Sequence, residues 1–189
     1  ASSATDVRQF FSVNGVYQIP YHARVLRPLV RGWSVSGVAT ARTGLPVNIT
    51  VSRAATAVPG GYNLTQRPDV VPGVALTPPG GSTAARWLNP AAFAIPSPGT
   101  WGNAGRNLAR GPNLYQIDLS VARRIALAER LNLEIRAEAF NVLNRAQLGN
   151  PIGDVTVPAQ FGIIQSTINT TPIGSGTPRQ MQLLLRLGW

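Results

Sequence analysis

The chain has 189 residues, no cysteine, one histidine and a formal net charge of +10, and all 17 of its basic residues are arginine. The missing thiols exclude disulfides, cysteine-bound zinc and thiol nucleophiles, and one histidine is a poor basis for a metal centre or a Ser-His-Asp triad. We therefore expect no metal and no cofactor. The arginines are spread from Arg8 to Arg186. Nucleic-acid binders concentrate their charge in one patch, so the spread argues against that class. It favours either attraction to anionic surfaces such as lipopolysaccharide phosphates or pairing of the arginines inside a polar barrel wall.

The first two predicted strands cover residues 7–19 and 29–51. In the first, apolar and polar residues alternate with a period of two, which is typical of a strand with one apolar face. Pro20 ends this strand because proline cannot donate a hydrogen bond to a sheet. The second range shows the same alternation on both sides of Thr43-Gly44-Leu45-Pro46. It is predicted to be one long strand, or two collinear strands, with a bulge at that point.

Residues 53–113 form the first of two predicted long loops. This stretch is rich in Pro, Gly, Ala and Asn, and long loops on one side are ordinary in membrane barrels. It contains three aromatic residues, Trp87, Phe93 and Trp101. We favour a local core that holds the loop together, but a binding surface for a ligand or glycan remains an open interpretation.

Three further strands are predicted at 114–126, 130–140 and 179–189. The first of these alternates most cleanly from Tyr115 to Ala122, the second alternates strictly, and a short turn joins them, which predicts a hairpin. A helix is the rival for the second, but a helix would spread its apolar residues around its whole surface. Residues 144–177 form the second predicted long loop.

The last predicted strand carries the sharpest signal. Apolar residues occupy every second position up to a terminal aromatic: Met181, Leu183, Leu185, Leu187 and Trp189. In a membrane barrel this set faces lipid, and Trp189 lies at the interface between lipid and water. The alternative is an amphipathic strand of a soluble β-sandwich.

Glu134, Arg136 and Glu138 lie at alternate positions on one polar face. Paired carboxylates can act as acid and base in glycoside hydrolysis. We prefer a ladder of charges on the lumen side of a barrel, with the arginine between the two acids. No nucleophile–base pair or metal-ligand set stands out, so the chain is predicted not to be an enzyme.

Short motifs in a fixed order carry a resemblance to a known family. They are Tyr17-Gln18-Ile19-Pro20, Gly32-Trp33-Ser34-Val35-Ser36-Gly37, Thr43-Gly44-Leu45-Pro46, Arg67-Pro68-Asp69, Trp87-Leu88-Asn89-Pro90-Ala91-Ala92-Phe93, Gly99-Thr100-Trp101-Gly102-Asn103-Ala104-Gly105-Arg106-Asn107, Asp118-Leu119-Ser120, Arg136-Ala137-Glu138-Ala139-Phe140-Asn141, Phe161-Gly162 and Pro178-Arg179-Gln180. In order and spacing they resemble the C-terminal barrel region of TonB-dependent outer-membrane receptors, especially the Oar-like group. The resemblance implies a plugged barrel of about 22 strands, opened by the periplasmic partner TonB to import a bulky ligand. The motifs include no plug and no TonB box, so they support fold and origin rather than transport.

The sequence thus predicts an all-β fold: one barrel-derived domain over residues 1–189, an antiparallel meander of about five to seven amphipathic strands with long loops. The smallest closed membrane barrels have about eight strands, so both sheet edges need partners. Our first expectation is a structural segment that self-associates, with other copies completing its edges in an oligomer, tube or filament. The alternatives are the C-terminal part of an intact TonB-dependent transporter and a soluble glycan-binding β-sandwich. We expect it in the bacterial outer membrane or on the extracellular surface.

Overall fold

The computed structural model describes residues 3–20, 31–61, 65–169 and 176–189. Its contacts group into two compact units. We call Ala1–Gln9, Thr43–Asn113 and Leu148–Ile168 the loop unit, and Phe10–Arg42, Leu114–Gln147 and Asn169–Trp189 the sheet unit. The prediction of a single domain is not tested by this grouping and stays a prediction.

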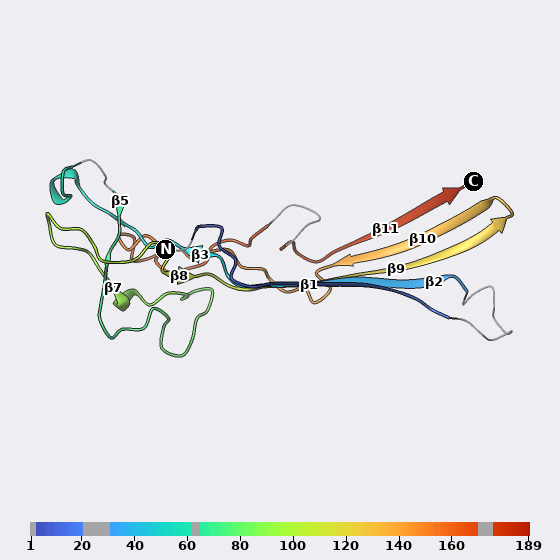
Figure 1. The fold of residues 1–189 in the computed structure, drawn as a ribbon, viewed down its shortest axis with the longest axis horizontal. Coiled ribbons are helices and arrows are strands. Elements are labelled where there is room, and N and C mark those ends of the chain that lie inside the picture. The colour runs from blue at the N-terminus through green and yellow to red at the C-terminus, as the bar shows by residue number, and fades with distance from the viewer. Residues whose placement is uncertain (1–2, 21–30, 62–64, 170–175) are drawn as a thin grey trace. The chain divides into compact units, whose positions relative to one another are not determined.

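The sheet unit is one antiparallel sheet of five strands. Its strands, in spatial order, are β1 (Phe10–Gln18), β2 (Trp33–Arg42), β9 (Leu114–Ala128), β10 (Leu131–Phe140) and β11 (Gln180–Gly188). Figure 1 shows them from blue β1 to red β11, with the C-terminus at the end of β11. Strands that follow one another within this unit are neighbours, so the predicted all-β antiparallel meander is confirmed. The helical elements among the described residues are two short 3-10 turns, η1 (Ala55–Ala57) and η2 (Pro90–Ala92).

The prediction of one long strand over 29–51 is wrong beyond Arg42. There the chain leaves the five-stranded sheet, and β3 (Pro46–Val47) and β4 (Val51–Ser52) pair with strands of the loop unit instead. Gly44 marks the departure, because a Cβ at this position would lie 1.8 Å from the carbonyl oxygen of Gly111. Only glycine allows so close a backbone approach. Residues 29 and 30 of the predicted range lie outside the described residues.

The loop unit is built from short strand pairs rather than from one sheet. These are β3 with β8 (Ala109–Arg110), β4 with β5 (Thr65–Gln66), and β6 (Asp69–Val70) with β7 (Phe93–Ala94). They enclose a core of Val47, Ile49, Leu88, Ala92, Phe93, Ala109 and Phe161. The rings of Phe93 and Phe161 meet edge to face at 5.5 Å. The long loop is therefore a folded body with its own hydrophobic centre.

A turn at Pro78–Gly81 projects from the loop unit. The Gly81 N–H donates to the Pro78 carbonyl oxygen at 3.1 Å. Gly80 and Gly81 are exposed, both have positive φ, and a Cβ added at either position would meet no atom within 4 Å. Glycine is needed here for its backbone conformation and not for space.

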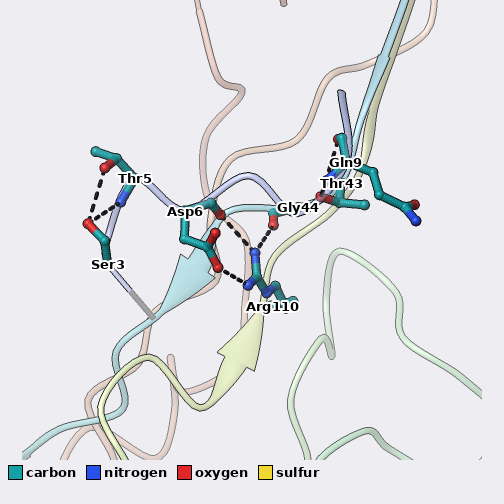
Figure 2. Close-up of polar contacts among 7 residues, drawn as sticks. All are labelled: Ser3, Thr5, Asp6, Gln9, Thr43, Gly44 and Arg110. Carbon is teal, nitrogen blue, oxygen red and sulfur yellow. Dashed lines mark hydrogen bonds and ion pairs between the residues drawn. The ribbon is translucent and has the colours of Figure 1, made fainter. Parts of the chain in front are cut away.

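Within the loop unit, the segment before β1 is held to the rest of the unit by polar contacts. The Arg110 guanidinium donates to the Asp6 carboxylate at 2.5 Å, to the Asp6 carbonyl at 2.8 Å and to the Gly44 carbonyl at 3.2 Å (Figure 2). The backbone N–H of Thr43 donates to the carbonyl of Gln9 at 3.0 Å. These contacts hold together three chain segments, which lie just before β1, just after β2 and at β8.

Candidate membrane interface

One face of the sheet unit is apolar and open. Its clearest strip lies on β11, where the five predicted residues are between 54% and 94% exposed: Met181, Leu183, Leu185, Leu187 and Trp189. The register places Ala137 beside Leu183, Ile135 beside Leu185 and Leu133 beside Leu187, so the apolar strip continues onto β10. In a soluble sandwich a second sheet would cover such a face. Among the described residues these side chains stay exposed, which suits contact with lipid.

The apolar face continues across the remaining strands in register. Val121 on β9 lies opposite both Ala137 and Val35, and Val35 lies opposite Tyr17 on β1. Four of the five strands contain 9 or 10 residues. A tilted strand needs about 9–11 residues to cross a bilayer. The strand lengths therefore match a hydrocarbon core.

Two aromatic side chains on the apolar face have arginines nearby. Near the hairpin end, the Arg123 guanidinium carbon lies 5.5 Å from the ring centre of Trp33. Near the opposite end, the guanidinium carbon of Arg145 lies 4.8 Å from the ring centre of Tyr115. Tyr115 and Arg123 are eight positions apart on β9, which gives about 27 Å along a strand and about 20 Å after a tilt of about 45°. Ile125, Leu133 and Leu187 continue the apolar face beyond Arg123 toward the hairpin, so the apolar face is longer than this spacing.

The opposite face of the sheet carries the charged ladder. Arg136 donates to Glu134 at 2.6 Å and lies 3.5 Å from the carboxylate of Glu138. Arg124 also reaches Glu134, at 3.3 Å, and Gln182 donates to Glu138. The arginine thus lies between the two acids, and each carboxylate has at least two partners. A wall of paired charges is typical of the lumen side of a barrel.

Asp118 belongs to a separate polar group on the same face. Its carboxylate accepts from the side chain of Gln116 at 2.9 Å and from the backbone N–H of Asn141 at 2.8 Å. Asn141 is almost fully buried, has a φ of 48° and donates to the carbonyls of Arg145 and Thr177. It stabilises the chain where β10 ends. We did not single it out from the sequence, although an Asn directly after a strand favours a positive φ.

The three loop aromatics do not form one cluster. Phe93 lies in the core of the loop unit, and Trp87 packs against that core and donates from its indole nitrogen to the Arg110 carbonyl at 2.7 Å. Trp101 is 61% exposed. It lines a cleft together with polar residues. Two of the three thus hold the loop together, and the third faces solvent.

The described part of the chain has no helix that is long and apolar enough to cross a membrane. It also has no group of three or more His, Asp or Glu side chains placed to hold a metal ion. The prediction that the protein is not an enzyme stays a prediction.

The comparisons with known proteins agree with the surface chemistry of the sheet. Over residues 1–182 the chain matches the family described as outer membrane beta barrel domain. Because the match covers nearly the whole chain, the protein belongs to this family and is an outer-membrane β-barrel protein. No curated protein and no solved structure matches it.

Proposed function

We propose that the sheet unit is a section of the wall of an outer-membrane barrel, and that polypeptide other than a second copy of this sheet supplies the strands that close it. The apolar face then meets lipid and the charged ladder faces the lumen. The loop unit is exposed outside the cell. Relatedness to TonB-dependent receptors, as indicated by the motif order, is part of this proposal.

The directions of the two edge strands carry the proposal. Phe10, Arg42 and Leu114 share one end of the sheet by register, and Phe140 and Gln180 are paired at that same end. From this end β1, β9 and β11 run toward the hairpin, and β2 and β10 run back. The two edge strands, β1 and β11, therefore point in the same direction.

Bacterial single-chain barrels are antiparallel and have an even number of strands. Five strands can be completed to such a barrel only by an odd number of others, whose outermost members run opposite to β1 and β11. Copies of this sheet inserted in the same orientation would meet edge to edge in parallel. Our first expectation, self-association, stays a prediction, and the strand directions favour completion by other polypeptide.

The connections at the two ends of the sheet support an outward-facing loop unit. At one end of the sheet β9 and β10 are joined by the short turn at Glu129-Arg130, and β1 and β2 are joined by residues 19–32. The opposite end bears both long connections, 43–113 and 141–179. Barrels of this membrane have short periplasmic turns and longer extracellular loops. Arginines of the outer region would then meet lipopolysaccharide phosphates.

Import of a bulky ligand, energised by TonB, is the second candidate function. The observation that favours it is the charged ladder, because large barrels have a polar, water-filled or plugged lumen. The smallest barrels fill their interior with packed side chains instead.

The strand-direction argument is tested with two differently tagged copies of the full chain, produced together in a bacterial outer membrane. We expect no co-purification of the copies after gentle detergent extraction.

Disulfide crosslinking is a second test. The chain contains no cysteine, so a disulfide can form only between cysteines that are introduced. Val13→Cys in one copy and Leu183→Cys in the other should give no disulfide between copies. The control pair Val13→Cys with Ala39→Cys, opposite each other in one sheet, should oxidise within a copy. A stable ring of copies, or an efficient Val13–Leu183 crosslink, would overturn the proposal.

A further inference from the structure

We propose that the loop unit carries a binding cleft for acidic oligosaccharides. The cleft has a volume of about 390 Å³, within the range of about 300–1,000 Å³ of small-ligand pockets. It is lined by Asn48, Thr50, Thr65, Gln66, Arg67 and Trp101. This inference goes beyond the proposed function and does not depend on how the barrel closes, because all of these residues belong to the loop unit.

One wall of the cleft comes from the alternation of residues 47–51. Val47, Ile49 and Val51 are buried in the loop unit. Because successive side chains of an extended chain point to opposite sides, Asn48 and Thr50 point away from this core. That side is the cleft, so the residues that build the core also orient an amide and a hydroxyl group outward.

A buried arginine organises the adjacent wall. β4 pairs with β5, which sets Gln66 opposite Val51. Arg53 is 8% exposed, and its guanidinium donates to the Gln66 side-chain oxygen at 3.3 Å and to the carbonyls of Thr100 and Ser97 at 2.9 and 2.8 Å. One side chain therefore fixes both the Gln66 amide and the backbone that leads into the exposed tryptophan.

A second clamp holds the other side of that tryptophan. The N–H of Asn103 donates to the Asp69 carboxylate at 3.0 Å, and the Asn103 side chain accepts from the N–H of Val70 at 2.8 Å. Gly102 packs closely against the backbone of Arg67, and a Cβ on Gly102 would lie 2.0 Å from the Arg67 carbonyl oxygen. Trp101 and Arg67 are thus held beside each other before any ligand arrives, which lowers the entropic cost of binding.

The side chains match the chemistry of an acidic sugar. An exposed indole offers an apolar face against which the C–H face of a sugar ring can pack. Amides and hydroxyls can both donate to and accept from sugar hydroxyls. Arg67 is exposed, and among the described residues no carboxylate pairs with its guanidinium. A planar guanidinium is suited to bidentate binding of a carboxylate.

The charge of the loop unit points the same way. It contains six arginines against three aspartates: Arg8, Arg53, Arg67, Arg86, Arg106 and Arg110, with Asp6, Asp69 and Asp154. A net positive unit attracts anions. Peptide ligands are recognised mainly through free strand edges or apolar grooves, whereas this cleft presents amides, hydroxyls and one aromatic ring. The observations therefore favour an acidic glycan.

Calorimetric titration of the full chain in detergent micelles tests the inference. The probes are a hexamer of galacturonic acid and the core oligosaccharide released from lipopolysaccharide, which separate an environmental glycan from a cell-surface one. We expect at least one of them to bind. Trp101→Ala should weaken that binding by about tenfold, and Trp101→Phe should restore most of it. Arg67→Gln should weaken binding of the acidic probe but not of neutral maltohexaose.

Two controls distinguish binding in the cleft from non-specific attraction by positive charge and from loss of the folded structure. Arg106→Gln removes an exposed charge that does not line the cleft and should leave affinity unchanged. Limited proteolysis should show that Trp101→Ala keeps the loop unit folded. The inference is overturned if neither oligosaccharide binds, if polyglutamate binds as well as the sugars, or if Trp101→Ala and Arg106→Gln bind alike.

Discussion

The sheet unit and the loop unit use the same sequence pattern for opposite purposes. On β11 every second residue is apolar and exposed, and on 47–51 every second residue is apolar and buried. The first set suits lipid and the second forms a protein core. Alternation therefore indicates an extended chain with one apolar and one polar face. Whether the apolar face contacts lipid or a protein core depends on the rest of the structure.

The polar residues of the two units differ in a similar way. In the sheet unit the charges satisfy each other along one face, as Arg136 does between Glu134 and Glu138. In the loop unit a buried arginine, Arg53, donates mainly to backbone carbonyls and so replaces regular secondary structure. A body made of two-residue strands needs such side-chain contacts to satisfy its backbone.

The largest expected effect comes from emptying the core of the loop unit. Leu88→Ala removes a side chain that is 2% exposed and should cost about 3–5 kcal/mol. Hydrogen exchange in detergent should show lost protection in the loop unit and retained protection in β9 and β10. Ile95→Ala, at an exposed position, is the matched control. Equal loss of protection in both units would show that the sheet unit does not stay folded when the core of the loop unit is disrupted.

The next effect tests whether the apolar face of the sheet meets lipid. Val121→Arg places a charge near the middle of β9 and should destabilise the chain in vesicles by about 2–4 kcal/mol. Its neighbour Ser120 lies on the charged face, opposite Glu138, so Ser120→Arg should change stability little. Denaturant unfolding in vesicles measures both. Equal tolerance of the two substitutions would argue for water on both faces.

A smaller effect is expected at the contact drawn in Figure 2. Asp6→Ala removes the ion pair with Arg110, whose side chains are partly exposed at 34% and 21%. We expect a loss of about 1 kcal/mol in the unfolding free energy of the loop unit, weakened further by salt. Asp69→Ala is unsuitable as a control because it breaks the clamp beside Trp101, so Arg8→Ala serves instead. A loss that is independent of salt would contradict an ionic contribution.

The smallest effect concerns pH. Asp154 is partly buried, and burial alone would raise its pKa, but hydrogen bonds from Thr156 and Ser52 outweigh this and lower the pKa below its usual value. A lowered folded-state pKa stabilises the fold above the pKa of the unfolded chain, and this stabilisation is lost as the pH falls through the folded-state pKa. Asp154→Asn should remove that acid sensitivity and cost about 1 kcal/mol or less at neutral pH. Thermal unfolding between pH 2 and 7 measures it, and an unchanged pH slope would contradict the assignment.

The strands of the sheet could be predicted because their pattern is strict and long. Within the predicted strand 114–126, apolar residues occupy every second position from Tyr115 to Val121, and this alternation was enough to predict an antiparallel strand. Ala126 to Leu143 could have been a helix by composition, yet its alternation correctly predicted a strand, which the structure has at Leu131–Phe140. Local composition was the weaker guide.

The loop unit could not be predicted because its contacts are far apart in the sequence. The Asn150 side chain donates to the carbonyl of Pro46, 104 positions away. A local sequence pattern cannot predict such a contact. The predicted strand over 29–51 was wrong at Val47 and Ile49 for the same reason, because their alternation is indistinguishable from that of a barrel strand. Trp101 was correctly noticed as an aromatic in a loop, but its separation from Phe93 depends on long-range packing.

The turn at Pro78–Gly81 gives the molecule a practical use. Both glycines are exposed, their positions are open, and the core of the loop unit lies in other residues. Insertions are tolerated best at such tips. If the loop unit lies outside the cell, as proposed, a foreign peptide grafted between Gly80 and Gly81 should be carried to the bacterial surface by an unchanged wall, and the protein could serve as a scaffold for surface display.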